Sequence, residues 1–244
     1  MTQQAVSSHP ISDVLQTAQG RGHRDDPVLA GTGGPAGNAL LTAWLGLLLL
    51  ALFLAELVTL LNVKGWISWH IGLGLLLIPP ALAKTASTGW RILRYYAGAE
   101  PYVQAGPPPL LLRLLGPLVI GGTLAVLGTG VLLIALGPTS GRQTWFSLLG
   151  FGVSPLTLHQ ASFIVWAVAT GLHVLARLVP AFQRITSSAG PGLPGRSMRG
   201  LALLVTVAVA AVLTLVVLAY SSSWTNGNLR DHQGHRGTSQ GPGG

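Results

Sequence analysis

Five long apolar stretches, separated by connections that are polar or rich in Gly and Pro, dominate the pattern of this 244-residue chain. They span about residues 39–63, 67–86, 110–136, 156–179 and 201–220. About 20 apolar residues in a helix cross the hydrocarbon core of a bilayer, so each stretch is long enough to span it. The pattern predicts an all-α integral membrane bundle of five transmembrane helices over residues 38–220.

The two ends of the chain have a different composition. Residues 1–37 and 221–244 are polar, rich in Gly and Ser, and show no apolar periodicity. Such segments bury too little apolar surface to offset the entropy of ordering. We predict a disordered N-terminal region and a disordered C-terminal tail.

Two features close to the second apolar stretch carry further structural predictions. The pair Pro79–Pro80 lies inside this stretch, where it removes backbone donors and predicts a kink or a local break. The segment Gly89–Tyr96 combines arginine with aromatic residues and predicts a short interfacial helix.

Lysine and arginine side chains are distributed unevenly among the connections. One set of alternate connections, together with the adjoining ends of the stretches, holds Arg21, Arg24, Arg91, Arg94, Arg113, Arg177, Arg184, Arg196 and Arg199. The other set holds Lys64, Arg142, Arg230 and Arg236. By the positive-inside rule, this bias predicts a bacterial-type inner-membrane protein with a cytoplasmic N terminus and an external C terminus.

Composition narrows the chemistry that the chain can perform. Only 8% of the residues are charged, and the net charge of +8 resides in loops beside apolar segments, so we do not expect nucleic-acid binding. Cysteine is absent, which excludes disulfides, thiolate-held iron–sulfur clusters and covalently attached c-type haem. Histidine is the redox-metal ligand that remains.

Three histidines within the apolar stretches are the main candidates for function. His159 and His173 are 14 residues apart, which leaves a rotation of about 40° and places them on one helix face, about 21 Å apart. His70 lies near the start of the second stretch, which runs parallel to the fourth in a five-span topology. Two imidazoles at matching depth predict a b-type haem between His70 and His159, in a core formed by helices two to four.

The inner level, around His173, leaves alternatives open. A second haem there would use His173, but position 84, the matching position on the second stretch, is Lys84. Lys84 would pair with a haem propionate or a lipid phosphate, or extend to the interface. Arg91 and Arg94 would meet lipid phosphate, a haem propionate or a cytoplasmic partner. Glu56 would be a proton or quinone-proton acceptor, or make a hydrogen bond within the bundle.

This arrangement resembles the cytochrome b561-like and ferric-reductase-like transmembrane di-haem cytochromes b. The resemblance covers about residues 66–180. It rests on His159 and His173 in Leu-His-Gln-Ala-Ser-Phe-Ile-Val-Trp-Ala-Val-Ala-Thr-Gly-Leu-His, and on His70 in Trp-His-Ile-Gly-Leu-Gly. It implies one haem b, or two, and an electron-transfer subunit of an oxidoreductase rather than a complete enzyme.

The resemblance also implies redox partners. Electrons would pass between a quinol pool or a cytoplasmic donor and an extracytoplasmic partner protein such as a molybdenum oxidoreductase. The alternative function is a cofactor-free membrane scaffold, or a proton-conducting or transport protein. Transporters commonly show internal repeats and broken helices, whereas the first, third and fifth stretches are uniformly apolar.

Overall fold

The computed structural model describes residues 26–107, 110–186 and 192–220, together with positions 12, 15, 16, 18 and 19. Its elements are α2 (Gly34–Thr59), η1 (Leu60–Asn62), α3 (Ile67–Tyr96), α4 (Glu100–Gln104), α5 (Leu110–Ser140), β1 (Phe146–Leu148), β2 (Phe151–Val153), α6 (Pro155–Thr186) and α7 (Arg196–Tyr220). The predictions of disorder for most of residues 1–25 and for residues 221–244 lie outside the described residues. So do Arg21, Arg24, Arg230 and Arg236, which contributed to the predicted orientation.

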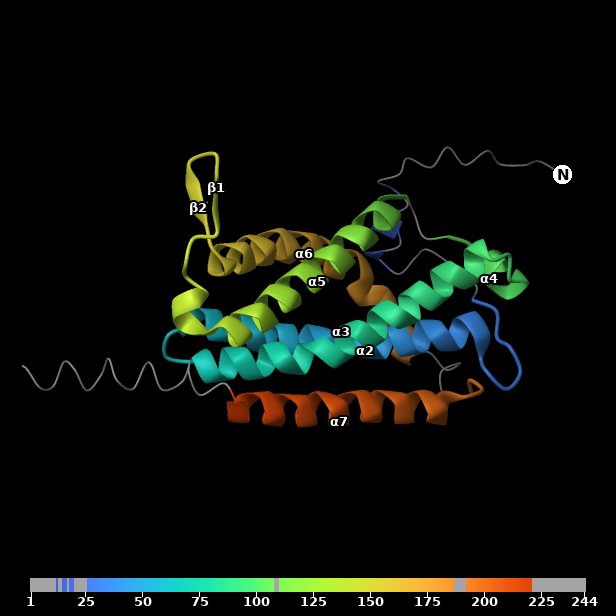
Figure 1. The fold of residues 1–244 in the computed structure, drawn as a ribbon. Coiled ribbons are helices and arrows are strands. Elements are labelled where there is room, and N and C mark those ends of the chain that lie inside the picture. The colour runs from blue at the N-terminus through green and yellow to red at the C-terminus, as the bar shows by residue number, and fades with distance from the viewer. Residues whose placement is uncertain are drawn as a thin grey trace, which may run out of the picture.

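The all-helical membrane architecture is confirmed. The five long helices α2, α3, α5, α6 and α7 are each long and apolar enough to cross a membrane. Consecutive long helices run in alternating directions, so α3 and α6 are parallel (Figure 1). The chain is therefore a multi-pass membrane protein.

The ends of the first two spanning helices differ from the predicted bounds. Helix α2 begins at Gly34 rather than at residue 39, because Gly33 caps it with φ 69° and Pro35 suits the first turn. Residues 34–37 thus belong to the bundle. Helix α3 continues to Tyr96, so Gly89–Tyr96 is its last part and not a separate interfacial helix.

The proline pair does not interrupt α3. Pro79 and Pro80 lie inside one continuous helix, and Pro80 is among the most completely buried side chains. Each proline removes only one backbone donor, and packing of the ring against neighbouring helices offsets part of that loss. The predicted break is therefore absent, although α3 bends along its length (Figure 1). In α5, Gly137 has non-helical backbone angles, with φ 74° and ψ 173°.

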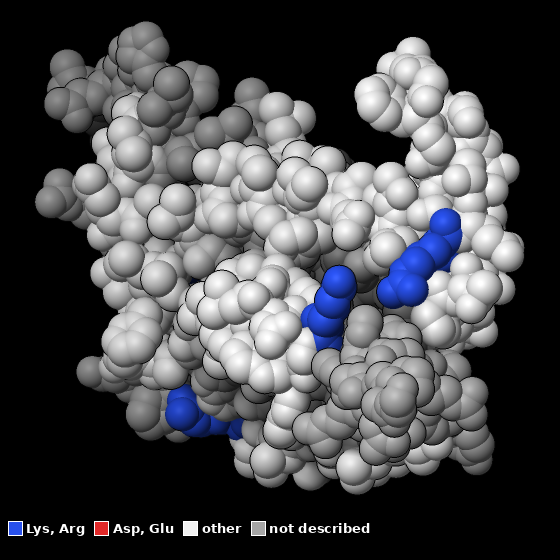
Figure 2. Space-filling model, turned by 90° about the vertical axis from the view of Figure 1, so that its left-hand side faces the viewer, with Lys and Arg blue, Asp and Glu red and all other residues white. Residues whose placement is uncertain are grey.

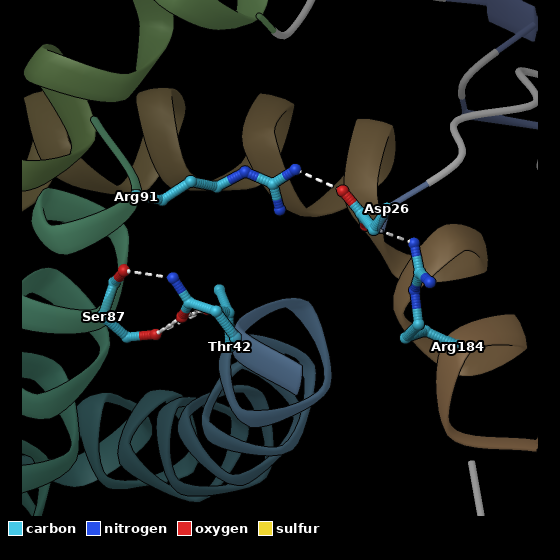
Figure 3. Close-up of polar contacts among 6 residues, drawn as sticks. Asp26, Thr42, Ser87, Arg91 and Arg184 are labelled. Atoms are coloured by element: carbon cyan, nitrogen blue, oxygen red, sulfur yellow. Dashed lines mark hydrogen bonds and ion pairs between the residues drawn. The ribbon is translucent and has the colours of Figure 1, made fainter. Parts of the chain in front are cut away.

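Helix α2 is central to the packing. It packs against both α3 and α6, whereas α5 packs mainly on α6 and α7 mainly on α3. Polar side chains join α2 to α3: Asn38 Nδ2 donates to the Ser87 carbonyl at 3.0 Å, and the Thr42 and Ser87 hydroxyls are 2.9 Å apart (Figure 3). The hydrophobic effect does not drive helices together within lipid. Interhelical hydrogen bonds such as these therefore contribute to holding a membrane bundle together.

Aromatic and hydroxyl side chains connect the other face of α2 to α5 and α6. The rings of Phe53 and Trp166 meet edge to face with centroids 4.7 Å apart. Trp166 Nε1 also donates to Thr123 Oγ1 at 2.8 Å. These contacts hold α2, α5 and α6 around a common interior without bringing α3 and α6 into close backbone contact. The space between α3 and α6 is where the histidines lie.

A short antiparallel hairpin, formed by β1 and β2, connects α5 to α6 and was not predicted. Phe146 pairs with Val153, and Leu148 pairs with Phe151. The hairpin extends sideways from the end of the bundle (Figure 1). The surface seen from this end is mostly uncharged and shows a few basic side chains but no acidic one among the described residues (Figure 2).

Candidate functional site

A cavity of about 2400 Å³ lies among helices α2, α3, α5 and α6. Most of its lining is apolar, but it contains most of the ionisable groups singled out in the sequence. Those lining it are His70, His159, His173, Glu56, Lys84 and Arg91. Arg94 is not part of the lining. The fold therefore brings side chains from three of the spanning helices to one interior space.

His70 and His159 lie close together in this cavity, with their rings edge to face. The centroids of their imidazole rings are 6.2 Å apart, and the ring planes are inclined by 81°. A metal bound between two imidazoles lies about 2.0 Å from each nitrogen, which is itself about 1.1 Å from its ring centre. Ring centres about 6 Å apart are therefore expected for two imidazoles on opposite sides of one metal. The observed separation agrees with this value.

The hydrogen bonds of both rings leave the same nitrogen available. His70 Nδ1 lies 2.6 Å from Glu56 Oε1 and 3.2 Å from Thr59 Oγ1. His159 Nδ1 lies 3.0 Å from Thr129 Oγ1. In both residues Nδ1 is engaged by an oxygen, and Nε2 is the nitrogen left for a ligand. Metal-binding histidines are commonly oriented in this way by a carboxylate or another hydrogen-bonding group.

The donor set fits haem better than a bare metal ion. Within the described part of the chain, no group of three or more His, Asp or Glu side chains is placed to hold a metal by itself. A structural zinc site needs about four protein ligands, whereas haem brings four nitrogens of its own and takes only two axial ligands. Two imidazoles in an apolar cavity are a ligand set that could hold a b-type haem.

Glycines provide room beside the two histidines. Gly74, one turn after His70, lines the cavity, and a Cβ atom built on it would meet no other atom within 4 Å. A Cβ atom on Gly130 would lie 3.3 Å from His159 Cε1. Gly130 thus lets α5 approach the imidazole closely, and Gly74 leaves open space for a flat group between the helices.

The inner level of the cavity is arranged differently. His173 Nδ1 is buried and has no hydrogen-bond partner. The charges of Lys84 and Arg177 act on this imidazole, and Lys84 Nζ donates to the Thr42 carbonyl at 3.3 Å. Lys84 therefore turns toward α2 within the span. No second imidazole faces His173 among the described residues.

Arg91 and Arg94, which the sequence treats as a pair, have different surroundings. Arg91 and Arg184 both form ion pairs with Asp26, whose side chain is only 2% exposed (Figure 3). Arg94 is exposed and lies over the rings of Trp90 and Tyr102, at 5.5 and 5.8 Å. Asp26 thus joins the start of the bundle to the ends of α3 and α6.

Sequence reasoning did not single out Thr59, Thr129 and Asp26. Thr59 follows Glu56 by three residues, which is one helical turn, so its proximity to Glu56 was accessible from the pattern. Thr129 lies between Gly128 and Gly130 in an apolar stretch that also holds Thr123, so nothing in the sequence distinguished its hydroxyl. The sequence positions of Thr59 and Thr129 do not show which way their helices face. Their hydrogen bonds to His70 and His159 could therefore be identified only from the structure.

Comparison of the chain with family models, with curated proteins and with solved structures found no match. The resemblance to haem-binding membrane families therefore stays a prediction, and function is inferred from the site alone.

Proposed function

We propose that this protein is a membrane b-type cytochrome that holds one haem between His70 and His159. The observation that supports this most directly is the pair of imidazoles 6.2 Å apart, each with Nδ1 engaged by an oxygen and Nε2 available. Haem held by two imidazoles is low-spin and closed to oxygen, and it supplies one-electron transfer. The protein would act as an electron-transfer subunit, not as a complete enzyme.

The residues around the pair would have distinct roles. Glu56 and Thr59 orient His70 and place negative charge behind it, and Thr129 orients His159 through a neutral hydroxyl. The cavity that surrounds the two imidazoles has a mostly apolar lining. The positive-inside bias would place this level near the external face, beside an extracytoplasmic redox partner, with a quinol pool or a cytoplasmic protein as the donor.

A reduced-minus-oxidised absorption spectrum of purified protein, with haem quantified per chain, tests the proposal. We expect a low-spin b-type spectrum and about one haem per chain. His70→Ala and His159→Ala should each abolish it, whereas His173→Ala, in the same cavity, should retain it. Size-exclusion profiles would confirm that the variants remain folded. A colourless wild-type protein, produced with ample haem, would refute the cytochrome function.

The second candidate function is proton conduction. Glu56, His70, His159, His173 and Lys84 all line one cavity, and chains of ionisable groups inside a membrane can relay protons. Colourless protein that carries a proton current in liposomes, lost in His173→Ala, would support it. Colourless protein without such a current would leave a structural scaffold.

A further inference from the structure

The β1–β2 hairpin exposes an unusual amount of apolar surface for a short connection. Trp145, Phe146, Leu148 and Phe151 are between 49% and 76% exposed, and Leu149 is 90% exposed. Leu149 is the most exposed large apolar side chain among the described residues. A two-stranded hairpin of this kind is marginally stable in water, so its apolar side chains require a partner surface.

The turn of the hairpin places leucine where another residue is preferred. Leu149 and Gly150 form the two-residue turn, with φ values of 49° and 82°. Positive φ at both positions favours Asn-Gly or Asp-Gly, and a bulky residue there is disfavoured. Leu149 is the only non-glycine residue with positive φ in the described part of the chain. The tip thus carries an apolar side chain despite the backbone conformation.

The hairpin lies at the boundary of the hydrocarbon core. Helix α6 begins at Pro155, two residues after β2, and carries no charged residue until Arg177. Those 22 residues are about 33 Å long, close to the core thickness of about 30 Å. The hairpin extends sideways from the bundle and does not continue the line of the helices, so its course is along the membrane surface rather than away from it (Figure 1).

We propose that this hairpin is an interfacial anchor, which buries its tip in the headgroup region of the lipid leaflet at that end of the bundle. Its residues 143–153 carry no charge, whereas the exposed Arg142 at its base is placed to meet lipid phosphate. Trp145 and the two phenylalanines are side chains that favour the membrane interface. This proposal depends on the membrane placement of the bundle and not on haem.

Because the chain has no cysteine, single cysteines can be labelled cleanly with an environment-sensitive fluorophore. Leu149→Cys reports on the tip, Lys64→Cys on an exposed connection at the same end, and Leu124→Cys on the lipid-facing surface of α5. Each protein would be reconstituted in phosphatidylcholine–phosphatidylglycerol vesicles at one copy per many lipids. Quenching by iodide in water would be compared with quenching by lipids that carry a nitroxide near the headgroup.

We expect the tip label to be quenched by the nitroxide lipid and to be several-fold less accessible to iodide than the Lys64→Cys label. Adding Phe146→Ser and Phe151→Ser should restore iodide access at the tip. Equal iodide access at both sites would overturn the proposal, as would protection from both quenchers, which would mean that protein covers the tip. If the serine changes had no effect, the label itself would be inserting, and the anchor would be refuted.

Discussion

Glu56→Gln removes one negative charge behind a proposed haem ligand while keeping the size of the side chain. The carboxylate oxygen lies 2.6 Å from His70 Nδ1. Since a metal on Nε2 would lie about 4 Å beyond Nδ1, the carboxylate and the metal would be about 7 Å apart. At an effective dielectric constant of about 20, unit charges at this distance interact by about 2.4 kcal/mol, which corresponds to about 100 mV for one electron.

The direction of the shift follows from the charge. The carboxylate stabilises the oxidised iron, which carries one more positive charge than the reduced iron, so its loss should raise the midpoint potential by tens of millivolts, up to about 100 mV. The measurement is a redox titration of the b-type absorbance band at fixed pH, in lipid nanodiscs. Thr129→Val is the matched control, because it removes the hydrogen bond to His159 without changing charge. Its shift should be well below that of Glu56→Gln. Equal shifts, or a lower potential in Glu56→Gln, would contradict the assignment of the carboxylate to His70.

Three further outcomes follow from the described contacts. Gly130→Ala should weaken haem retention, because its new methyl group would lie 3.3 Å from His159 Cε1. Gly128→Ala is the control: its methyl group would meet nothing within 4 Å, so this variant should bind haem normally. Pyridine haemochrome assays of the two variants would measure the haem retained. Asp26→Asn should destabilise the protein by about 1–3 kcal/mol, because two guanidinium groups lose their shared carboxylate; thermal unfolding in nanodiscs measures this. Glu100→Gln, on an exposed hydrogen bond, should change stability by less than about 0.5 kcal/mol.

The sequence predicted the spanning helices well and the connections poorly, for a physical reason. Twenty apolar residues in a row are a strong signal because lipid demands that the backbone satisfy its own hydrogen bonds. Once a helix leaves the core this demand ends, and the residues after Lys84 no longer reveal whether α3 continues to Tyr96. The hairpin was missed because its strands are only three residues long each, and because the turn between them is Leu-Gly rather than the Asn-Gly or Asp-Gly that marks a hairpin.

The candidate site was predictable in part. The spacing of His159 and His173, and the parallel course of the second and fourth stretches, placed His70 and His159 at one level, and the structure brings their rings together. The orienting groups were not predictable, because they depend on the rotation of α2 and α5 about their own axes. The sequence left two roles for Glu56, a proton acceptor or a hydrogen-bonding group within the bundle. The structure places one oxygen of its carboxylate against His70, and the second oxygen is buried and has no hydrogen-bond partner.

The contrast between the two levels of the cavity favours one haem over two. At the His70 level, a carboxylate and two hydroxyls face the nitrogens opposite the proposed metal, so a positive centre there is electrostatically stabilised. At the His173 level, Nδ1 of the imidazole has no hydrogen-bond partner, and two positive side chains, Lys84 and Arg177, line the same cavity. A cationic iron would be repelled there and would lack a second imidazole.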